Sequence, residues 1–425
     1  MYIGIGKYMF SHGAIGLWEP FRPPLLPIIL GSAWKIGIDP LIFGKIIMVI
    51  SSLVLIWLVY IIGEKLGKNI GLYSAALLSL TPVFIVFSNT PLSDIPSTLF
   101  ITLAFLVTLR KKYIVSGILM GLAFLTRFPQ IIALLPLVLS IWILQEESWK
   151  IKVRDIFFVL IGLALVTLPF FITNYFLYTN PLYPIIEGNR VAAESVYPAH
   201  EYFYYGTGLL TQNPLLIFVL VTLGLLIYQG KRLPSWRMIR SLFLFVIIPG
   251  AYFTINPHQE LRYAMMFLPF LVLLAGYGIA YITEKISWKF TSFVAVLLII
   301  AILGSIGLYG LKTHGSRYKV SPEQYEYLTY FKDKGRQEIL TSSPQSIVFS
   351  DISIVQAVST WEFADQVYND VRSHVSYIAI NTCELVCEDP ATCPHARESL
   401  LQKMKKEVQI FFKTTFGCEL YILKP

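Results

Sequence analysis

Long apolar runs that recur along most of the chain constrain its fold more than any other feature. About ten runs have roughly the length of a helix that crosses a ~30 Å hydrocarbon core. They cover approximately residues 41–63, 70–89, 94–109, 113–128, 130–145, 156–178, 207–228, 239–256, 261–283 and 289–311. Residues are 55% hydrophobic and only 14% charged. The sequence therefore predicts a polytopic, all-α membrane domain.

The distribution of Lys and Arg between the runs predicts their orientation. Cytoplasmic loops of membrane proteins carry an excess of basic residues. Here the basic connectors are those near residues 65–68, 110–112, 150–154, 231–240 and 285–289. We expect these in the cytoplasm, and the alternate connectors, residues 1–40 and the C-terminal tail outside. The same pattern accounts for the net charge of +8 without nucleic-acid binding.

The composition changes after about residue 312, where charged and apolar residues become mixed. Short apolar stretches at 338–341, 346–351 and 375–380 predict strands, and 322–334 and 396–412 predict amphipathic helices. We therefore divide the chain into a membrane domain, 1–313, and a small extracytoplasmic α/β domain, 314–425. Within the first domain, residues 1–40 form an amphipathic or re-entrant start, with a short proline-rich helix at 23–38.

All four cysteines lie in the predicted α/β domain: Cys383, Cys387, Cys393 and Cys418. An even number of cysteines in an exported domain indicates two disulfides. The spacing leaves all three pairings open. A zinc site that includes the nearby His395 is the alternative.

The connector between two apolar runs, Asn256-Pro257-His258-Gln259-Glu260-Leu261-Arg262-Tyr263, concentrates charged and polar residues. Each charge at membrane depth costs about 2.5–3.5 kcal/mol, so the cluster indicates a site at a membrane surface. The guanidinium of Arg262 matches the oxygens of a phosphate. His258 and Glu260 would orient it or contact a metal or substrate. The alternative is a hydrated loop whose arginine anchors to lipid phosphates.

Three further charged positions fall on the same predicted outer face. Prolines fix the turn that presents Arg22, three residues after Glu19; the alternative is an ordinary interfacial arginine. Asp94 begins a span, where it would also cap a helix. Arg127 interrupts two apolar runs, or is merely a hairpin-tip charge. Their shared face favours one outward-facing site.

Several motifs carry a family resemblance that covers roughly residues 1–310. The motifs are Phe21-Arg22-Pro23-Pro24-Leu25, Leu92-Ser93-Asp94-Ile95-Pro96, Gly121-Leu122-Ala123-Phe124-Leu125-Thr126-Arg127 and Glu260-Leu261-Arg262-Tyr263 followed by Leu268-Pro269. In order and spacing the chain resembles the polyprenyl-phosphate-dependent membrane glycosyltransferases of the GT-C fold. The branch it resembles most contains protein-O-mannosyltransferases and aminoarabinose-transferase-like enzymes.

The resemblance implies a reaction and the residues that perform it. A sugar would pass from a polyprenyl or dolichyl monophosphate to a protein, lipid or glycan acceptor outside the cell membrane, with inversion at the anomeric carbon. Arg22 and Arg262 would bind the donor phosphate, and Asp94 would be catalytic. The remaining pocket residues would be Glu19, Arg127, His258, Glu260 and Tyr263. No cofactor is required, although a divalent metal near Glu19 and His258 stays an alternative.

The chain also departs from the family pattern. Family members begin with one more span and a loop that carries an acidic general base, whereas this sequence starts at Met1 where the following amphipathic helix is expected. We therefore expect the natural protein to extend upstream, or this chain to be inactive. The alternative functions are transport of lipid-linked sugars or anionic solutes, and sugar binding without catalysis.

Overall fold

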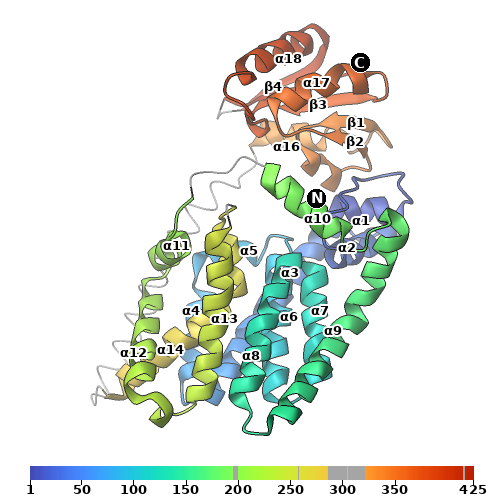
Figure 1. Cartoon of the computed structure of the whole chain (residues 1–425). Helices are drawn as coiled ribbons and strands as arrows, with labels where there is room; N and C mark the ends of the chain where they lie inside the picture. Colours follow the sequence, from blue (N-terminus) through green and yellow to red (C-terminus); the bar gives the residue numbers. More distant parts are fainter. Residues whose placement is uncertain (195–199, 257, 286–303, 305–320, 415–416) are drawn as a thin grey trace. The chain divides into compact units, whose positions relative to one another are not determined.

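The computed structural model describes residues 1–194, 200–256, 258–285, 304, 321–414 and 417–425 (Figure 1). They form two compact units. One unit contains Met1–Pro20, Leu26–Phe43 and Tyr318–Pro425, and the other contains Phe21–Leu25 and Gly44–Arg317. We call them the α/β unit and the helical unit. The predicted division at residue 313 differs, because the structure groups the N-terminal helices with the C-terminal residues. The predicted span 289–311 falls outside the described residues, except for residue 304.

The helical unit follows the predicted apolar runs. Its elements are α3 (Pro40–Leu66), α4 (Ile70–Ser79), α5 (Pro82–Phe87), α6 (Asp94–Leu109), α7 (Tyr113–Thr126), η1 (Phe128–Ala133), α8 (Leu134–Leu144), α9 (Trp149–Tyr178), α10 (Tyr183–Glu194), α11 (Tyr204–Gln212), η2 (Pro214–Phe218), α12 (Val219–Gln229), η3 (Gly230–Arg232), α13 (Trp236–Ile255), η4 (Leu261–Met266) and α14 (Leu268–Lys285). Among the described residues, five helices are long and apolar enough to cross a membrane, and shorter apolar helices accompany them. These helices support a multi-pass membrane protein.

Several predicted spans are interrupted rather than continuous. The run 70–89 is broken before Pro82, and the run 207–228 is broken before Pro214. Proline has no N–H to donate and excludes the preceding residue from helical geometry, so each proline starts a new helical segment. The predicted span 261–283 likewise begins as the short helix η4 before α14.

Glycines allow α7 and α9 to approach closely. A Cβ on Gly117 of α7 would lie 2.0 Å from the carbonyl oxygen of Val159, and one on Gly162 of α9 would lie 2.1 Å from that of Ile114. Small residues at such crossings let membrane helices pack backbone to backbone. The crossing fixes α7, which also packs against α6.

The α/β unit contains a five-stranded sheet with the order β2-β1-β3-β5-β4, in which β2, β1 and β3 are parallel and β5 is antiparallel to both neighbours. Its C-terminal elements are α16 (Pro322–Thr329), β1 (Glu338–Thr341), η5 (Pro344–Val348), β2 (Ser353–Ala357), α17 (Trp361–Arg372), β3 (Tyr377–Asn381), η6 (Thr382–Glu384), α18 (Cys393–Glu407), β4 (Val408–Lys413) and β5 (Glu419–Leu423). The predicted fold class, a helical membrane domain with a small α/β domain, is confirmed.

Two local predictions in this unit are wrong. The predicted strand 346–351 is instead the 3-10 helix η5 and a turn, where the hydroxyls of Ser346 and Ser350 donate to the backbone carbonyls of Ser343 and Ser346. Hydroxyl groups that bond to nearby backbone compete with strand formation. The predicted helix 396–412 ends at Glu407, and its last residues form β4.

The N-terminal helices α1 (Tyr2–Phe10) and α2 (Leu25–Lys35) pack closely against one another. A Cβ on Gly6 of α1 would lie 2.5 Å from the carbonyl oxygen of Pro27, and one on Gly31 of α2 would lie 2.5 Å from that of Gly6. Only glycine permits this approach of two backbones, since any Cβ would collide.

The four cysteines form two disulfides, as predicted. Cys383 pairs with Cys418 and Cys387 pairs with Cys393, each with a Cα–Cα distance of 5.4 Å. The first bond joins the segment after β3 to the start of β5, and the second closes the loop before α18. No free thiol is left for the alternative zinc site.

Candidate functional site

Asp94 and Arg127 meet at one end of the helical unit. Asp94 begins α6 and Arg127 directly follows α7, and a short connector joins these two helices. The two residues form an ion pair, in which Asp94 is 2% exposed and the arginine side chain 12%. Removing one partner of such a buried ion pair strongly destabilises the folded protein, because the other charge is left buried and unpaired.

The connector before α14 forms a second polar group. Nη2 of Arg262 donates to Oε1 of Glu260 over 2.9 Å. Nε2 of His258 lies 2.7 Å from Oε1 of Glu260, and its Nδ1 lies 2.9 Å from the hydroxyl of Tyr263. The four predicted residues of this connector are therefore in mutual contact.

Tyr263 joins the two groups into one cluster. The guanidinium carbon of Arg127 lies 4.5 Å from the centroid of the Tyr263 ring, and that of Arg262 lies 5.5 Å from it. A cation close to an aromatic ring is attracted by the ring's quadrupole. We call this set the arginine cluster, and its members are Asp94, Arg127, His258, Glu260, Arg262 and Tyr263.

Exposure divides the arginine cluster into two parts. Asp94 and Arg127 are almost enclosed, whereas the side chains of His258, Glu260 and Arg262 are 31%, 37% and 28% exposed. The enclosed pair is almost inaccessible to solvent, and its arginine contacts the Tyr263 ring. The exposed trio is accessible, so a ligand would reach Arg262 rather than Arg127.

The other two predicted residues belong to other segments of the chain. Arg22 belongs to the short segment Phe21–Leu25 of the helical unit, and its guanidinium carbon lies 5.1 Å from the ring of Phe21. Glu19 belongs to the α/β unit. Their place in the site stays a prediction.

A second pair behind the cluster was not predicted. Gln130 Nε2 donates to Ser97 Oγ over 2.7 Å, and both side chains are buried. Ser97 follows Asp94 by one helical turn, and Gln130 follows Arg127 by the same step. The sequence signal for this hydrogen bond is a polar residue three positions after each charged residue.

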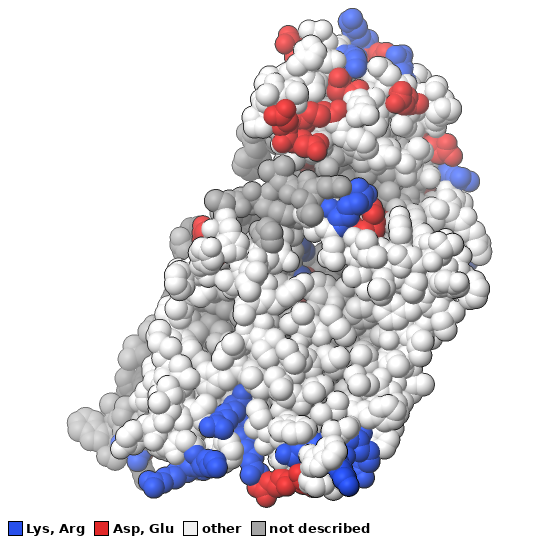
Figure 2. Space-filling view, in the orientation of Figure 1, with Lys and Arg blue, Asp and Glu red and all other residues white. Residues whose placement is uncertain are grey.

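Basic residues gather at the opposite end of the same helices. Figure 2 shows Lys and Arg side chains concentrated where α8 meets α9 and α12 meets α13. Exposed ion pairs such as Lys111–Glu147 lie there. The 16 residues of α6 span about 24 Å between the two ends. The cluster and the basic loops thus lie on opposite ends, as the orientation argument predicted.

No metal centre stands out in the described part of the chain. Among these residues, no group of three or more His, Cys, Asp and Glu side chains is placed to hold a metal ion. The alternative metal near Glu19 and His258 therefore has no support from the described residues.

Comparisons with known proteins agree with this arrangement. Residues 22–175 match the family model described as "Dolichyl-phosphate-mannose-protein mannosyltransferase". ArnT from Cupriavidus metallidurans bound to undecaprenyl phosphate superposes with a TM-score of 0.64 at 13% identity, over 99% of this chain and 92% of that one. Its apo state gives a TM-score of 0.63 at the same identity and coverage. No curated protein sequence matches the chain.

The comparisons confirm the predicted resemblance and the fold. At 13% identity the structural match shows a shared fold. The family model covers the segment that contains Arg22, Asp94 and Arg127. Together they show that the chain is similar in sequence to this family over residues 22–175 and shares the ArnT fold.

Proposed function

We propose that this chain transfers a sugar from a polyprenyl or dolichyl monophosphate to an acceptor on the extracytoplasmic face of the membrane. The observation that carries the proposal is the partly exposed Arg262, held beside Glu260 and Tyr263 at the end of the helices remote from the basic loops. The family match and the ArnT-like fold support the same donor class. The α/β unit would then also face outward.

The donor phosphate would replace Glu260 as the partner of Arg262. Arg262 contacts both oxygens of the Glu260 carboxylate, Nη2 with Oε1 at 2.9 Å and Nε with Oε2 at 2.5 Å, and a phosphate offers a guanidinium the same pair of oxygens. Glu260 would keep His258 as its neighbour at 2.7 Å after the exchange. Arg22 is the second cation that we assign to the phosphate.

In the reaction, the bond between the anomeric carbon and the phosphate oxygen breaks while an acceptor hydroxyl attacks from the opposite face and gives up its proton to water. This single displacement inverts the configuration, and polyprenyl phosphate leaves. Negative charge grows on the bridging phosphate oxygen as the bond breaks. Arg22 and Arg262 would stabilise that charge, and preorganised donors aimed at a developing charge are an effective form of catalysis.

We assign Asp94 a positioning role rather than the catalytic role that the resemblance implies. Its carboxylate is engaged by Arg127, and it is almost fully enclosed. Such a group is poorly placed to receive a proton from an acceptor. It instead holds Arg127 against the Tyr263 ring, on which the exposed trio rests.

A transfer assay tests the proposal. The full chain in lipid nanodiscs would be incubated with mannosyl undecaprenyl phosphate radiolabelled in its lipid and with a membrane extract as source of protein, lipid and glycan acceptors, and release of undecaprenyl phosphate would be measured. We expect Arg262→Ala to lower kcat/KM by about 100-fold or more, the usual effect of removing one charge-stabilising donor. Arg110→Ala, an exposed arginine at the opposite end, is the matched control. Parent-level turnover by Arg262→Ala would refute the assignment.

A further inference from the structure

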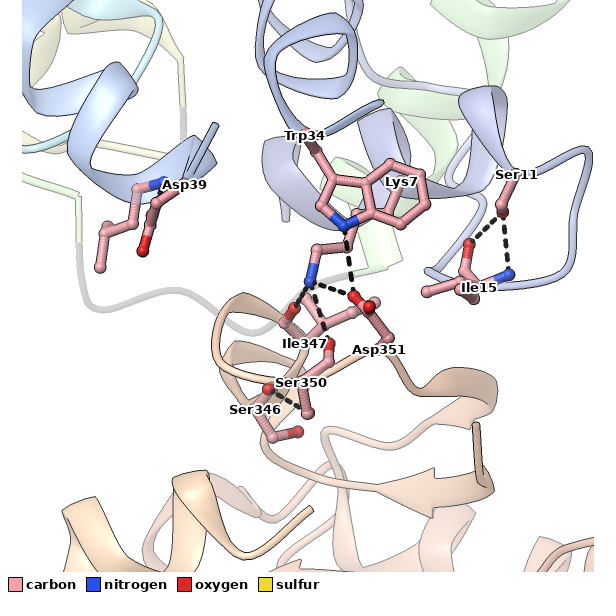
Figure 3. Close-up of polar contacts among 10 residues, drawn as sticks. Lys7, Ser11, Ile15, Trp34, Asp39, Ser346, Ile347, Ser350 and Asp351 are labelled. Carbon is pink, nitrogen blue, oxygen red and sulfur yellow. Dashed lines mark hydrogen bonds and ion pairs between the residues drawn. The ribbon is translucent and has the colours of Figure 1, made fainter. Parts of the chain in front are cut away.

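Lys7 is a buried charge with no role in the proposed chemistry. It lies in α1 and is only 3% exposed. Its Nζ donates to the carbonyl oxygens of Ile347 at 2.9 Å and Ser350 at 3.0 Å, and to Oδ1 of Asp351 at 3.0 Å (Figure 3). An ammonium group has three hydrogens, and burial is tolerable only when all are satisfied. This lysine is therefore fully bonded to a segment more than 300 residues away in sequence.

Asp351 also binds the second N-terminal helix. Nε1 of Trp34 in α2 donates to the same Oδ1 over 3.3 Å. Figure 3 shows the Trp34 ring above the Lys7 amine, with both groups directed at Asp351. One carboxylate thus joins α1 and α2 to the turn that follows η5.

The N-terminal segment also extends the sheet. Gly16 N donates to the carbonyl of Ile352 over 2.8 Å, and Ile354 N donates to the carbonyl of Gly16 over 2.9 Å. Leu17 packs against the hydrophobic cluster that contains Ile352 and Ile354. The attachment of residues 1–20 to the C-terminal residues therefore combines a polar anchor with a strand-like contact.

These contacts lie on both sides of the Arg22 turn. The segment Phe21–Leu25 is flanked by Met1–Pro20 and Leu26–Phe43, and both flanks belong to the α/β unit. The turn is thus a short loop whose two ends are held by one folded body. Fixing both ends removes backbone conformations before any ligand arrives.

We propose that Lys7 and Asp351 are positioning residues for the donor site, because they fix the loop that presents Arg22. The α/β unit then serves the transfer reaction itself, in addition to any contact with an acceptor. This inference rests on the proposed function, since it assigns Arg22 to the donor phosphate. Its distinctive consequence is that Lys7 acts only through Arg22.

Binding of undecaprenyl phosphate to the full chain in nanodiscs tests the proposal. We expect Lys7→Met to raise Kd by about fivefold, the effect of ordering one long side chain on binding rather than in advance. Lys403→Met is the matched control, because Lys403 in the same unit forms a 2.8 Å ion pair with Asp365 and lies near the Tyr368 ring, both in α17. We expect its Kd to stay within about twofold of the parent, which is a binding free-energy difference below RT.

Asp351→Asn provides a second variant that is milder for folding, because the Asp351 side chain is half-exposed. It keeps the side-chain shape and removes the charge, so we expect a smaller rise in Kd than for Lys7→Met. If Lys7→Met fails to fold, the Kd of Asp351→Asn alone tests the positioning role. A Kd equal to that of Lys403→Met would refute the positioning role.

A double-mutant cycle separates positioning from a general structural effect. In an Arg22→Ala background, we expect Lys7→Met to add nothing, because the residue that it positions is gone. Additive losses would overturn the inference. If Arg22→Ala and Arg262→Ala both leave Kd unchanged, the proposed function fails. If they raise Kd and Lys7→Met does not, only the positioning role fails.

Discussion

The two units hold their buried charges in different ways. In the helical unit, Asp94 and Arg127 neutralise each other. In the α/β unit, Lys7 is held by two backbone carbonyls as well as by Asp351. Glu384 there accepts hydrogen bonds from neutral groups of the described residues, Ser343 Oγ over 2.7 Å and Gln345 Nε2 over 3.4 Å. Burial raises the pKa of Glu384.

The ion pairs of the helical unit can exchange one anionic partner for another, whereas the contacts of Lys7 in the α/β unit are fixed. A carboxylate such as Glu260 is able to release its arginine when a phosphate arrives, because both are anions of similar geometry. Backbone carbonyls in a folded turn have no such alternative. We therefore expect ligand binding at the Glu260–Arg262 pair and a permanent structural contact at Lys7.

The largest effect that tests this comparison is expected at Asp94. Asp94→Asn leaves Arg127 as an enclosed cation without its counter-charge, and loss of one partner of a buried pair costs about 3–5 kcal/mol. We expect a clearly lower Tm of the full chain in detergent. The double variant Asp94→Asn/Arg127→Gln should recover much of this loss, because it leaves no unpaired charge.

Transfer activity provides the second measurement on the same variants. If Arg127 acts through Tyr263 on the exposed trio, the double variant should stay impaired in turnover although its Tm recovers. If the double variant is no more stable than Asp94→Asn, the unpaired charge of Arg127 is not the cause of the lower Tm. The helical unit would then hold its charges no differently from the α/β unit.

An intermediate effect is expected at Glu384, as a change in pH dependence. Because its pKa is raised in the folded state, the folded chain holds this proton more tightly than the unfolded chain. The stabilising contribution is therefore full below the unfolded pKa and is lost as the pH rises through the folded value. We expect Glu384→Gln to raise Tm at pH 7.5 and to flatten the fall in Tm between pH 4 and 7.5.

Glu398→Gln is the control for this experiment, because Glu398 is an exposed carboxylate of the same unit. Its Tm should follow the parent at each pH. An equal flattening in both variants would mean that burial of Glu384 is not responsible. A lower Tm of Glu384→Gln at pH 7.5 would show that its ionised form is favourable, contrary to the comparison.

The smallest effect is expected at the basic end of the helices. Lys111 and Glu147 form an ion pair of 2.7 Å with side chains 67% and 35% exposed. Water and salt screen such a pair. We therefore expect Glu147→Gln to leave Tm unchanged at physiological salt. A loss as large as that of Asp94→Asn would mean that position along the helix, and not burial, sets the strength of these pairs.

The sequence predicts most of the helical unit because its signals are local. Run length indicates the spans, and the distribution of basic loops places Asp94, Arg127 and Arg262 at one end. The mutual contacts through Tyr263 are not local, since they depend on the packing of η4 against α6. Pro82 and Pro214 interrupt their helices, but the residues around them are apolar, so each run was predicted as one continuous span.

The α/β unit is harder to predict because its decisive contacts are distant in sequence. Lys7 and Asp351 have no shared periodicity, and hydrophobic patterns report only neighbours along the chain. Residues 1–40 were therefore assigned to the membrane domain, although most of them group with the C-terminal residues. The misread strand 346–351 has a related cause, since serine hydroxyls there bond to the backbone of their own turn.

The division of the α/β unit between the two ends of the chain has a consequence for synthesis. Proteins emerge N-terminus first, and domains generally fold as units. Here α1 and α2 precede the helical unit along the chain, whereas β2 and Asp351, which contact the N-terminal segment, follow it. The loop with Arg22 is consequently fixed only after the helical unit has been made, so translation that stops before β2 leaves the N-terminal helices without Asp351.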